Sequence, residues 1–459
     1  MADSACAGVG VADLVLPKGN VVRLYYPAKS GSTTGRPARF VPCGSSDYWV
    51  GYAIYQFAFV GYAPLRYVLI PLLRLVAAVL FGRAAAEGAR EGAEAAEAGE
   101  DGALLPTVVF SHGLGSNRTA YAGLCSRVAA SGRVVAAVEH LDGTAGCATD
   151  GNTGAVAFYR HSKGTHAVRR PQVLQRVAEV RATLDLLHDL DAGRPLPGGA
   201  AAPPGGLARL LDLEDVSVAG HSMGGATAVL AASADARFKA CIAMDPYLLP
   251  TDLDDRASAV PLCVLMSHKW QARWTSGPHE VGKNTVCLER LLRLRTAAEA
   301  ASPAAVYGEL VGTAHMSASD IPRVLGPRLA ALVGGKKDSP FSPEEAVACH
   351  AALCVEFLET GAIEETASRY PDLVLEESSR GMDHIFESVV ERLARERAER
   401  NPSGSGGGGG GSGREKAGGG RGAPRGRKTG RKSEGGKAGV KDKDFRGQVE
   451  YGAKKYIKP

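Results

Sequence analysis

The chain has 459 residues, enough for one large α/β domain with additions or for two average domains. Its hydrophobic fraction of 45% and charged fraction of 22% are ordinary for a globular protein. Residues 402–459 hold 15 Lys/Arg against 5 Asp/Glu, a net charge of +10, whereas the whole chain carries +5. The remainder is therefore slightly acidic, at about −5, so the basic character belongs to the tail and gives no reason to infer nucleic-acid binding by the folded part.

Composition divides the chain into three parts. We expect a flexible N-terminus over 1–10, one domain over 11–400, and a disordered Gly/Lys/Arg-rich tail over 401–459. We interpret the tail as solvated charge and expect no specific nucleic-acid partner. Its run "RGRKTGRK" leaves open a nuclear localisation or nucleic-acid patch, or an attraction to anionic lipid.

The cysteines and the N-terminus indicate the compartment. Nine cysteines are scattered, without a CxxC pair, which favours buried free thiols in a reducing compartment. The first residues lack the basic and long apolar regions of a signal peptide. We therefore expect a cytoplasmic protein, with peripheral contact to membranes as an option.

The first elements predicted are a hairpin and an apolar helix. Residues 11–28 read as two strands around a Lys-Gly-Asn turn. Residues 62–82 form the most apolar segment, but Arg66 and Arg74 interrupt it, so a membrane span is disfavoured. A buried helix and an amphipathic helix on a lipid surface both remain open. Residues 83–104 are rich in Ala, Glu and Gly and predict a surface insertion that is partly helical.

Strands and helices alternate through the rest of the chain. Apolar runs predict strands at 107–115, 133–140, 214–220, 239–245, 261–266 and 304–311. Helical patterns occupy 118–132, 169–193, the segment after Ser222, 343–360 and 381–400. This order indicates an α/β fold with a mostly parallel central sheet and helices on both faces.

The stretch Gly220-His221-Ser222-Met223-Gly224 fits the pattern G-x-S-x-G between a predicted strand and a predicted helix. In a nucleophile elbow, small flanking residues let a strained serine project above the sheet. A plain glycine-rich packing turn is the other interpretation. The strand-to-helix context favours the nucleophile, and the following helix points its positive end at the site.

A serine needs a base, and the base needs an orienting acid. In this fold the three follow in the order serine, acid, histidine. Asp245 closes the strand after Ser222, and His315 follows the last strand on a loop of small residues. We predict a Ser222–His315–Asp245 triad. His221 orients the turn rather than acting as the base.

Two backbone N–H groups are expected to bind the oxyanion. Met223 follows the nucleophile and supplies one; the loop His112-Gly113-Leu114-Gly115 supplies the other, most simply from Leu114. The sequence holds no metal-ligand cluster, so we expect neither a metal nor a cofactor.

Several segments in order resemble one family. They are "LYYPA", "LFG", "VVFSHGLGSNRTAY", "RVVAAVEHLD", "AGHSMGGATAV", "DARFKACIAMDPYLLP" and "GTAH". Together, over about residues 11–360, they are similar to the platelet-activating factor acetylhydrolases, calcium-independent serine lipases of phospholipase A2 type. The ordered set is far more specific than G-x-S-x-G alone.

The resemblance implies an α/β-hydrolase fold and release of an acetyl, short or oxidised acyl chain from the sn-2 position of glycerophospholipids (1-alkyl-2-acetylglycerophosphocholine esterase activity). It carries over Ser222, Asp245 and His315 as the triad and Leu114 and Met223 as oxyanion donors. It also implies that residues 62–82 dock on a lipid surface.

The sequence departs from the family in two places. Leu141 stands where relatives usually carry arginine, so a polar contact is expected to be missing. The stretch from Asp245 to His315 is longer than usual and holds Trp270 and Trp274, so the pocket wall and acyl preference are expected to differ. The alternatives are a general carboxylesterase or acyltransferase on small soluble esters and a non-catalytic scaffold with a hydrolase fold.

Overall fold

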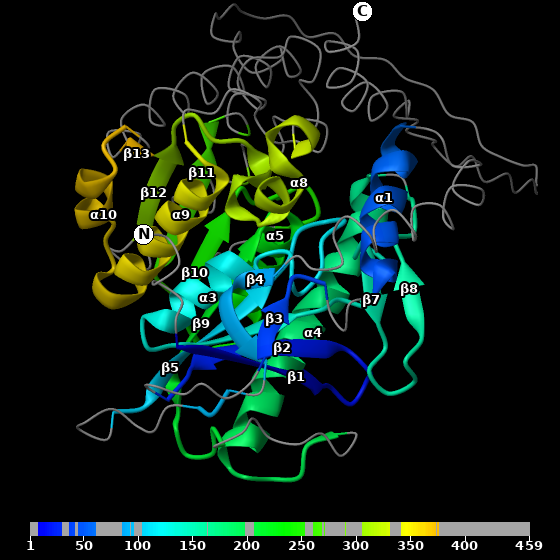
Figure 1. Ribbon diagram of the computed structural model, residues 1–459, viewed down its shortest axis with the longest axis vertical. Coiled ribbons are helices and arrows are strands. Elements are labelled where there is room, and N and C mark those ends of the chain that lie inside the picture. Colours follow the sequence, from blue (N-terminus) through cyan, green and yellow to red (C-terminus); the bar gives the residue numbers. More distant parts are fainter. Residues whose placement is uncertain are drawn as a thin grey trace, which may run out of the picture.

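The computed structural model in Figure 1 describes residues 8–29, 36–41, 45–60, 85–91, 93–95, 103–162, 164–197, 206–252, 260–268, 270, 290, 305–330, 341–372 and 374–375. The predicted apolar helix at 62–82, the predicted helix at 381–400 and the predicted tail at 401–459 lie outside these residues. Within them, no helix is both long and apolar enough to cross a bilayer.

The strands build one large sheet and one small hairpin. The sheet holds β1 Val9–Val15, β2 Val21–Pro27, β3 Arg36–Arg39, β4 Ala85–Glu91, β5 Leu105–Ser111, β6 Val134–Val138, β9 Leu211–His221, β10 Phe238–Met244, β11 Leu262–Ser267, β12 Ala305–Leu310 and β13 Val374–Leu375. The separate hairpin is β7 Cys147–Thr149 with β8 Val156–Phe158. The helices are α1 Ser46–Val60, α3 Ala122–Ala130, α4 His166–Asp191, α5 Met223–Ala234, α8 Ile321–Ala330, α9 Pro343–Thr360 and α10 Glu364–Arg369, with a 3₁₀ turn, η4, at His315–Ala318.

The sheet has the order β13-β12-β11-β10-β9-β5-β6-β2-β1-β4-β3. From β12 to β6 every neighbouring pair is parallel. The predicted opening hairpin is confirmed: β1 pairs antiparallel with β2, which joins the edge of β6. The predicted mostly parallel sheet is therefore confirmed, with antiparallel additions at its two ends.

Helices cover both faces of this sheet (Figure 1), because its central strands are apolar on both sides. On β5, Val109 packs into the cluster that holds α4 and α5, while Val108 and Phe110 face the cluster of α3 and α9. Side chains alternate along a strand, so a continuous apolar run requires cover on both faces. The six cysteines that the structure describes are buried free thiols, as predicted.

The insertion 83–104 was expected to be partly helical, but the main part of it that the structure describes is a strand. Residues Ala85–Glu91 form β4, which pairs parallel with β1 and antiparallel with β3. Ala89 is buried in the core cluster of α3. Alanine and glutamate are good helix formers, but intrinsic propensity is a small term, and pairing with a sheet edge overrides it.

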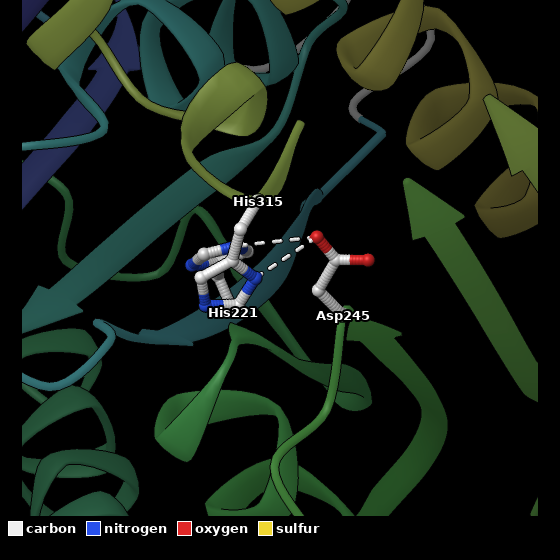
Figure 2. Close-up of side chains that lie close together, drawn as sticks. All are labelled: His221, Asp245 and His315. Atoms are coloured by element: carbon white, nitrogen blue, oxygen red, sulfur yellow. Dashed lines mark hydrogen bonds and ion pairs between the residues drawn. The ribbon is translucent and has the colours of Figure 1, made fainter. Parts of the chain in front are cut away.

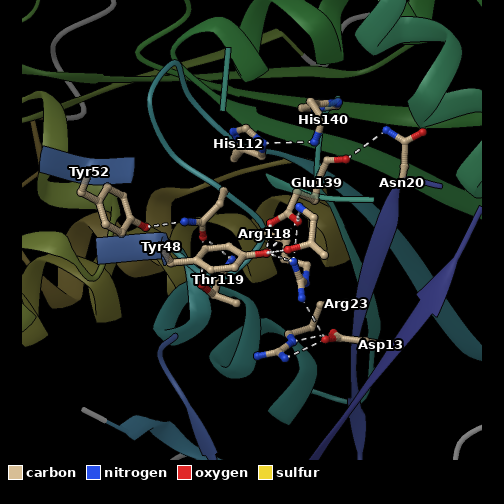
Figure 3. A network of polar contacts seen from close by, with 12 residues as sticks. Asp13, Asn20, Arg23, Tyr48, Tyr52, His112, Arg118, Thr119, Glu139 and His140 are labelled. Atoms are coloured by element: carbon tan, nitrogen blue, oxygen red, sulfur yellow. Dashed lines mark hydrogen bonds and ion pairs between the residues drawn. The ribbon is translucent and has the colours of Figure 1, made fainter. Parts of the chain in front are cut away.

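A buried polar network holds the N-terminal hairpin against the centre of the molecule (Figure 3). The Glu139 carboxylate, just after β6, accepts hydrogen bonds from Arg118 at 2.5 Å, from the Tyr48 hydroxyl of α1 at 2.8 Å and from the backbone N–H of Thr149 at 2.9 Å. Arg118 also reaches Asp13 on β1 at 3.1 Å. Burial raises the pKa of Asp13, but Arg23 and Arg118 outweigh it and hold this pKa below its usual range.

Removing the Glu139 charge should destabilise the fold strongly. We expect Glu139→Gln to lower the free energy of unfolding by about 3 kcal/mol, because Arg118 then keeps a buried charge with one partner fewer. Urea unfolding measures this. The control is Arg36→Ala, which removes an exposed pair with Glu91 and should cost about 0.5 kcal/mol or less. Equal losses in the two variants would contradict a structural role for the network.

Candidate active site

The candidate site lies where the strand order reverses. The chain runs from β5 to β6 on one side and then crosses to β9 on the other side of β5. Register pairs Ser111 with Gly220 and His221 with Met244, so β5, β9 and β10 end at the same edge. Ligands of open α/β sheets bind at the carboxyl ends of the strands, at such a switch point.

Ser222 occupies a strained turn between β9 and α5. Its φ is 57° and its ψ is −118°, a conformation that L-residues rarely adopt. The flanking glycines permit it: a Cβ on Gly220 would lie 2.2 Å from the Gly224 oxygen, and one on Gly224 would lie 2.0 Å from the Ser111 oxygen. A strained serine between a central strand of a mostly parallel sheet and the following helix is the nucleophile elbow of the α/β-hydrolase fold, so the predicted fold is confirmed.

The structure brings Ser222, His315 and Asp245 together from three separate segments. His315 Nε2 lies 3.0 Å from Ser222 Oγ, and His315 Nδ1 lies 3.1 Å from Asp245 Oδ2. Ser222 and Asp245 are buried, whereas the His315 side chain is 22% exposed. The base thus contacts both the hydroxyl and the carboxylate, and the site opens to solvent beside it.

Asp245 is built to stay ionised. Ser267, which closes β11, donates its backbone N–H to Oδ1 and its hydroxyl to Oδ2, each at 2.6 Å. Burial raises the pKa of Asp245, but the neighbouring imidazoles of His221 and His315 outweigh it and hold this pKa well below its usual range. A charged carboxylate fixes the imidazole tautomer that leaves Nε2 able to accept the serine proton.

His221 is tied to the loop after β5. Its Nδ1 lies 2.7 Å from the Tyr121 hydroxyl, whose oxygen accepts the Gly113 N–H at 3.3 Å. Its Nε2 faces Asp245 Oδ2 at 3.9 Å (Figure 2), too far for a hydrogen bond. This geometry suits the predicted orienting role.

Ligand atoms of His221, Asp245 and His315 all lie within 4.8 Å of one another, close enough for a metal ion. The Asp245 oxygens are already engaged by Ser267 and His315. We therefore interpret the group as a triad with an auxiliary histidine, not as a metal centre.

The two segments expected to supply the oxyanion donors lie beside the nucleophile: a Cβ on Gly113 would lie 3.4 Å from Ser222 Cβ. Met223 is the first residue of α5. In the facing loop, the Gly113 oxygen lies 2.8 Å from His112 Nδ1 and accepts the Ser116 N–H at 3.2 Å. Since a trans peptide directs its C=O and N–H oppositely, these bonds turn the Leu114 N–H away from His112. The oxyanion roles of Leu114 and Met223 stay predictions.

A buried guanidinium supports this loop from behind. Arg176 of α4 donates to the His112 carbonyl at 2.6 Å, and it pairs with Asp142 at 2.9 Å. Burial and the charge of Arg176 lower the pKa of His112 well below its usual value. His112 is therefore neutral, so one ring nitrogen can donate while the other accepts the His140 N–H at 3.3 Å.

Leu141 stands where an arginine was expected from the resemblance. Its backbone N–H donates to Glu179 at 3.3 Å.

Sequence reasoning missed the residues that support the triad. These residues are Tyr121, Arg176 and Ser267. The stacking of Trp270 on His315 was also missed. Ser267 had a usable signal, because it closes an apolar strand at the same edge as Asp245. Arg176 reaches the site from α4, and Tyr121 reaches it from the turn just before α3, on the opposite face of the sheet. No local pattern marks either residue.

The geometry predicts an activated serine. A fluorophosphonate should label Ser222, and His315→Gln should slow labelling by about a hundredfold or more, because the base no longer removes the proton. Mass spectrometry of the labelled peptide measures this. The matched control is His166→Gln, which removes an exposed histidine paired with Asp252. Equal labelling rates in both variants would show that His315 does not activate Ser222.

The sequence is similar to those of several known proteins. Platelet-activating factor acetylhydrolase of dog (Canis lupus familiaris) is 31% identical over 260 residues, 53% of this chain and 54% of the dog protein. The bovine (Bos taurus) protein of that name is 33% identical over 173 residues, 35% of this chain and 39% of the bovine protein. A putative phospholipase A2 of Schizosaccharomyces pombe is 25% identical over 310 residues, 57% of this chain and 68% of that protein. The chain thus spans about half the length of the dog relative and less of the bovine one.

A solved ferulic acid esterase from Streptomyces cinnamoneus superposes with a TM-score of 0.48 and 21% identity, covering 77% of this chain and 88% of the esterase. The model of the family described as platelet-activating factor acetylhydrolase, isoform II, matches residues 5–373, from the first hairpin to beyond α10. Since this match spans most of the chain, the protein belongs to the platelet-activating factor acetylhydrolase family.

Proposed function

We propose that the protein is a calcium-independent serine esterase that hydrolyses the sn-2 acetyl, short or oxidised acyl ester of platelet-activating-factor-like glycerophospholipids. The observation that carries this proposal is the contact of His315 with both Ser222 Oγ and Asp245. Family membership and the names of the dog and bovine relatives support the substrate class.

The proposed reaction has two halves. Ser222 Oγ attacks the sn-2 carbonyl as its proton passes to His315 Nε2, and the imidazolium then gives this proton to the departing glycerol oxygen. Water next attacks the acyl-enzyme, giving one proton to His315, and Ser222 leaves as the alcohol by taking that proton back. Each half develops a negative carbonyl oxygen, which the backbone N–H groups of Leu114 and Met223 stabilise.

The decisive assay compares 2-acetyl with 2-palmitoyl ether phosphocholine in the presence of a chelator, for wild type and Ser222→Ala. We expect acetate release that depends on Ser222 and falls steeply with chain length. The variant should lose at least about a thousandfold in kcat, because no other group provides the acyl acceptor.

Other outcomes identify the alternatives. Hydrolysis of small soluble esters without preference for the phospholipid would indicate a general carboxylesterase or acyltransferase. Folded wild-type protein that releases acid from neither kind of ester would contradict the esterase proposal and leave a non-catalytic scaffold.

We further propose that residues 62–82 bind a lipid surface and bring the site to its substrate. The support is in the sequence: the segment is strongly apolar, and Arg66 and Arg74 recur at helical spacing, as in amphipathic interfacial helices. Such a helix places basic side chains at the headgroups and apolar ones below them.

Negative charges introduced into residues 62–82 should weaken the proposed contact with lipid. Leu73→Glu with Leu75→Glu should weaken sedimentation with phosphocholine vesicles at least about tenfold, because burying a carboxylate in lipid is unfavourable. Hydrolysis of monomeric substrate should stay near the wild-type rate. The matched control is Leu104→Glu with Leu174→Glu, two leucines exposed elsewhere. Unchanged vesicle binding by the 73/75 variant would exclude this segment as the lipid contact.

A further inference from the structure

One aromatic residue lies directly on the proposed base. The indole of Trp270 stacks on the His315 imidazole with ring centroids 3.8 Å apart and planes 13° from parallel. Trp270 also packs against the core cluster that includes β10 and β11. The stack is therefore anchored to the body of the protein.

Trp270 comes from the same strand end that supports the acid. It lies three residues beyond Ser267, which donates both hydrogen bonds to Asp245. The segment leaving β11 thus touches the acid through Ser267 and the base through Trp270. A stacked ring prevents His315 from turning about its side chain, so Nδ1 keeps facing Asp245 and Nε2 keeps facing Ser222.

The stack also affects the free energy of the charged form of His315. The face of an aromatic ring carries negative potential and attracts a cation lying over it. His315 becomes such a cation when it takes the serine proton. Among the described residues, the titratable groups that face its ring are Asp245, from the end of β10, and His221, from the end of β9. The His221 and His315 ring centroids lie 4.5 Å apart. Asp245 favours the imidazolium and a charged His221 would oppose it.

We propose that Trp270 is a positioning residue for His315, fixing the plane of the imidazole and stabilising the imidazolium through its indole face. The inference rests on the proposed function, because it takes His315 as the general base. On this proposal Trp270 acts through His315, on whose ring it is stacked.

The pH profile separates this role from simple shielding. A cation–π contact favours the protonated ring, so Trp270→Leu should move the acidic midpoint of kcat/KM downward, by about half a pH unit, and lower kcat about three- to tenfold. If the indole only excluded water, its loss would hydrate the ring and move the midpoint upward. The two roles therefore predict opposite signs.

Trp270→Phe keeps a smaller aromatic face and should fall between wild type and Trp270→Leu. Trp49→Leu is the control, because Trp49 packs on Phe40 and Tyr52 and should leave the midpoint unchanged. An acidic midpoint that stays or rises in Trp270→Leu overturns the proposal. Should that variant fail to fold, the sign of the shift in Trp270→Phe decides.

An NMR titration makes the test independent of turnover. The His315 ring signal, assigned by its absence in His315→Gln, is followed against pH in Ser222→Ala with and without Trp270→Phe. A lower midpoint without the indole supports the proposal, and an equal or higher one refutes it. Absence of ester hydrolysis by wild type would instead refute the proposed function and leave this titration valid.

Discussion

The whole site depends on how closely two backbone segments approach at Ser222. The positive φ of Ser222 places it in a sparsely populated conformation that costs of the order of 1–3 kcal/mol, and the packing around it must hold it there. Gly220 and Gly224 make the approach possible, because a methyl group at either would collide with backbone oxygen. The backbone N–H of Ser222 is bonded to the Met244 carbonyl at 2.8 Å, and Tyr247 N–H donates to the Ser222 carbonyl at 2.9 Å. The strain is thus held by the strand and loop that also carry Asp245.

Aligned strand ends convert this one turn into a reaction centre. Because β5, β9, β10 and β11 are parallel and in register, their following loops gather at one edge. The edge brings a nucleophile, an acid, a support for the acid and the loop after β5 together at one place. Burying the Asp245 carboxylate is unfavourable, and the two hydrogen bonds from Ser267 and the neighbouring imidazoles of His221 and His315 offset this loss of hydration.

Much of this was predictable from sequence. The parallel sheet followed from strand–helix alternation, and the placement of Ser222, Asp245 and His315 followed from a motif and a fixed order of residue types. β4 was not predictable, since its Ala/Glu composition favours helix and only its neighbours β1 and β3 make it a strand. Tyr121 and Arg176 were not predictable for a related reason. Arg176 lies on α4 and Tyr121 caps the start of α3, and the helical pattern at each place indicates only burial. Trp270 was noted as part of a pocket wall, but stacking on His315 depends on a chain path that no pattern encodes.

The buried cysteines have a bearing on how inactivation of this protein is interpreted. Burial raises the pKa of the Cys241, Cys349 and Cys354 thiols to about 12, so each is protonated at neutral pH. Alkylating reagents attack the thiolate and need access to it. Cys241 on β10 and Cys263 on β11 sit in the two strands that carry Asp245 and Ser267 at their ends. Alkylation of Cys241 or Cys263 therefore requires these strands to separate, and inactivation that accompanies modification of either thiol measures opening of the sheet rather than chemistry at the site.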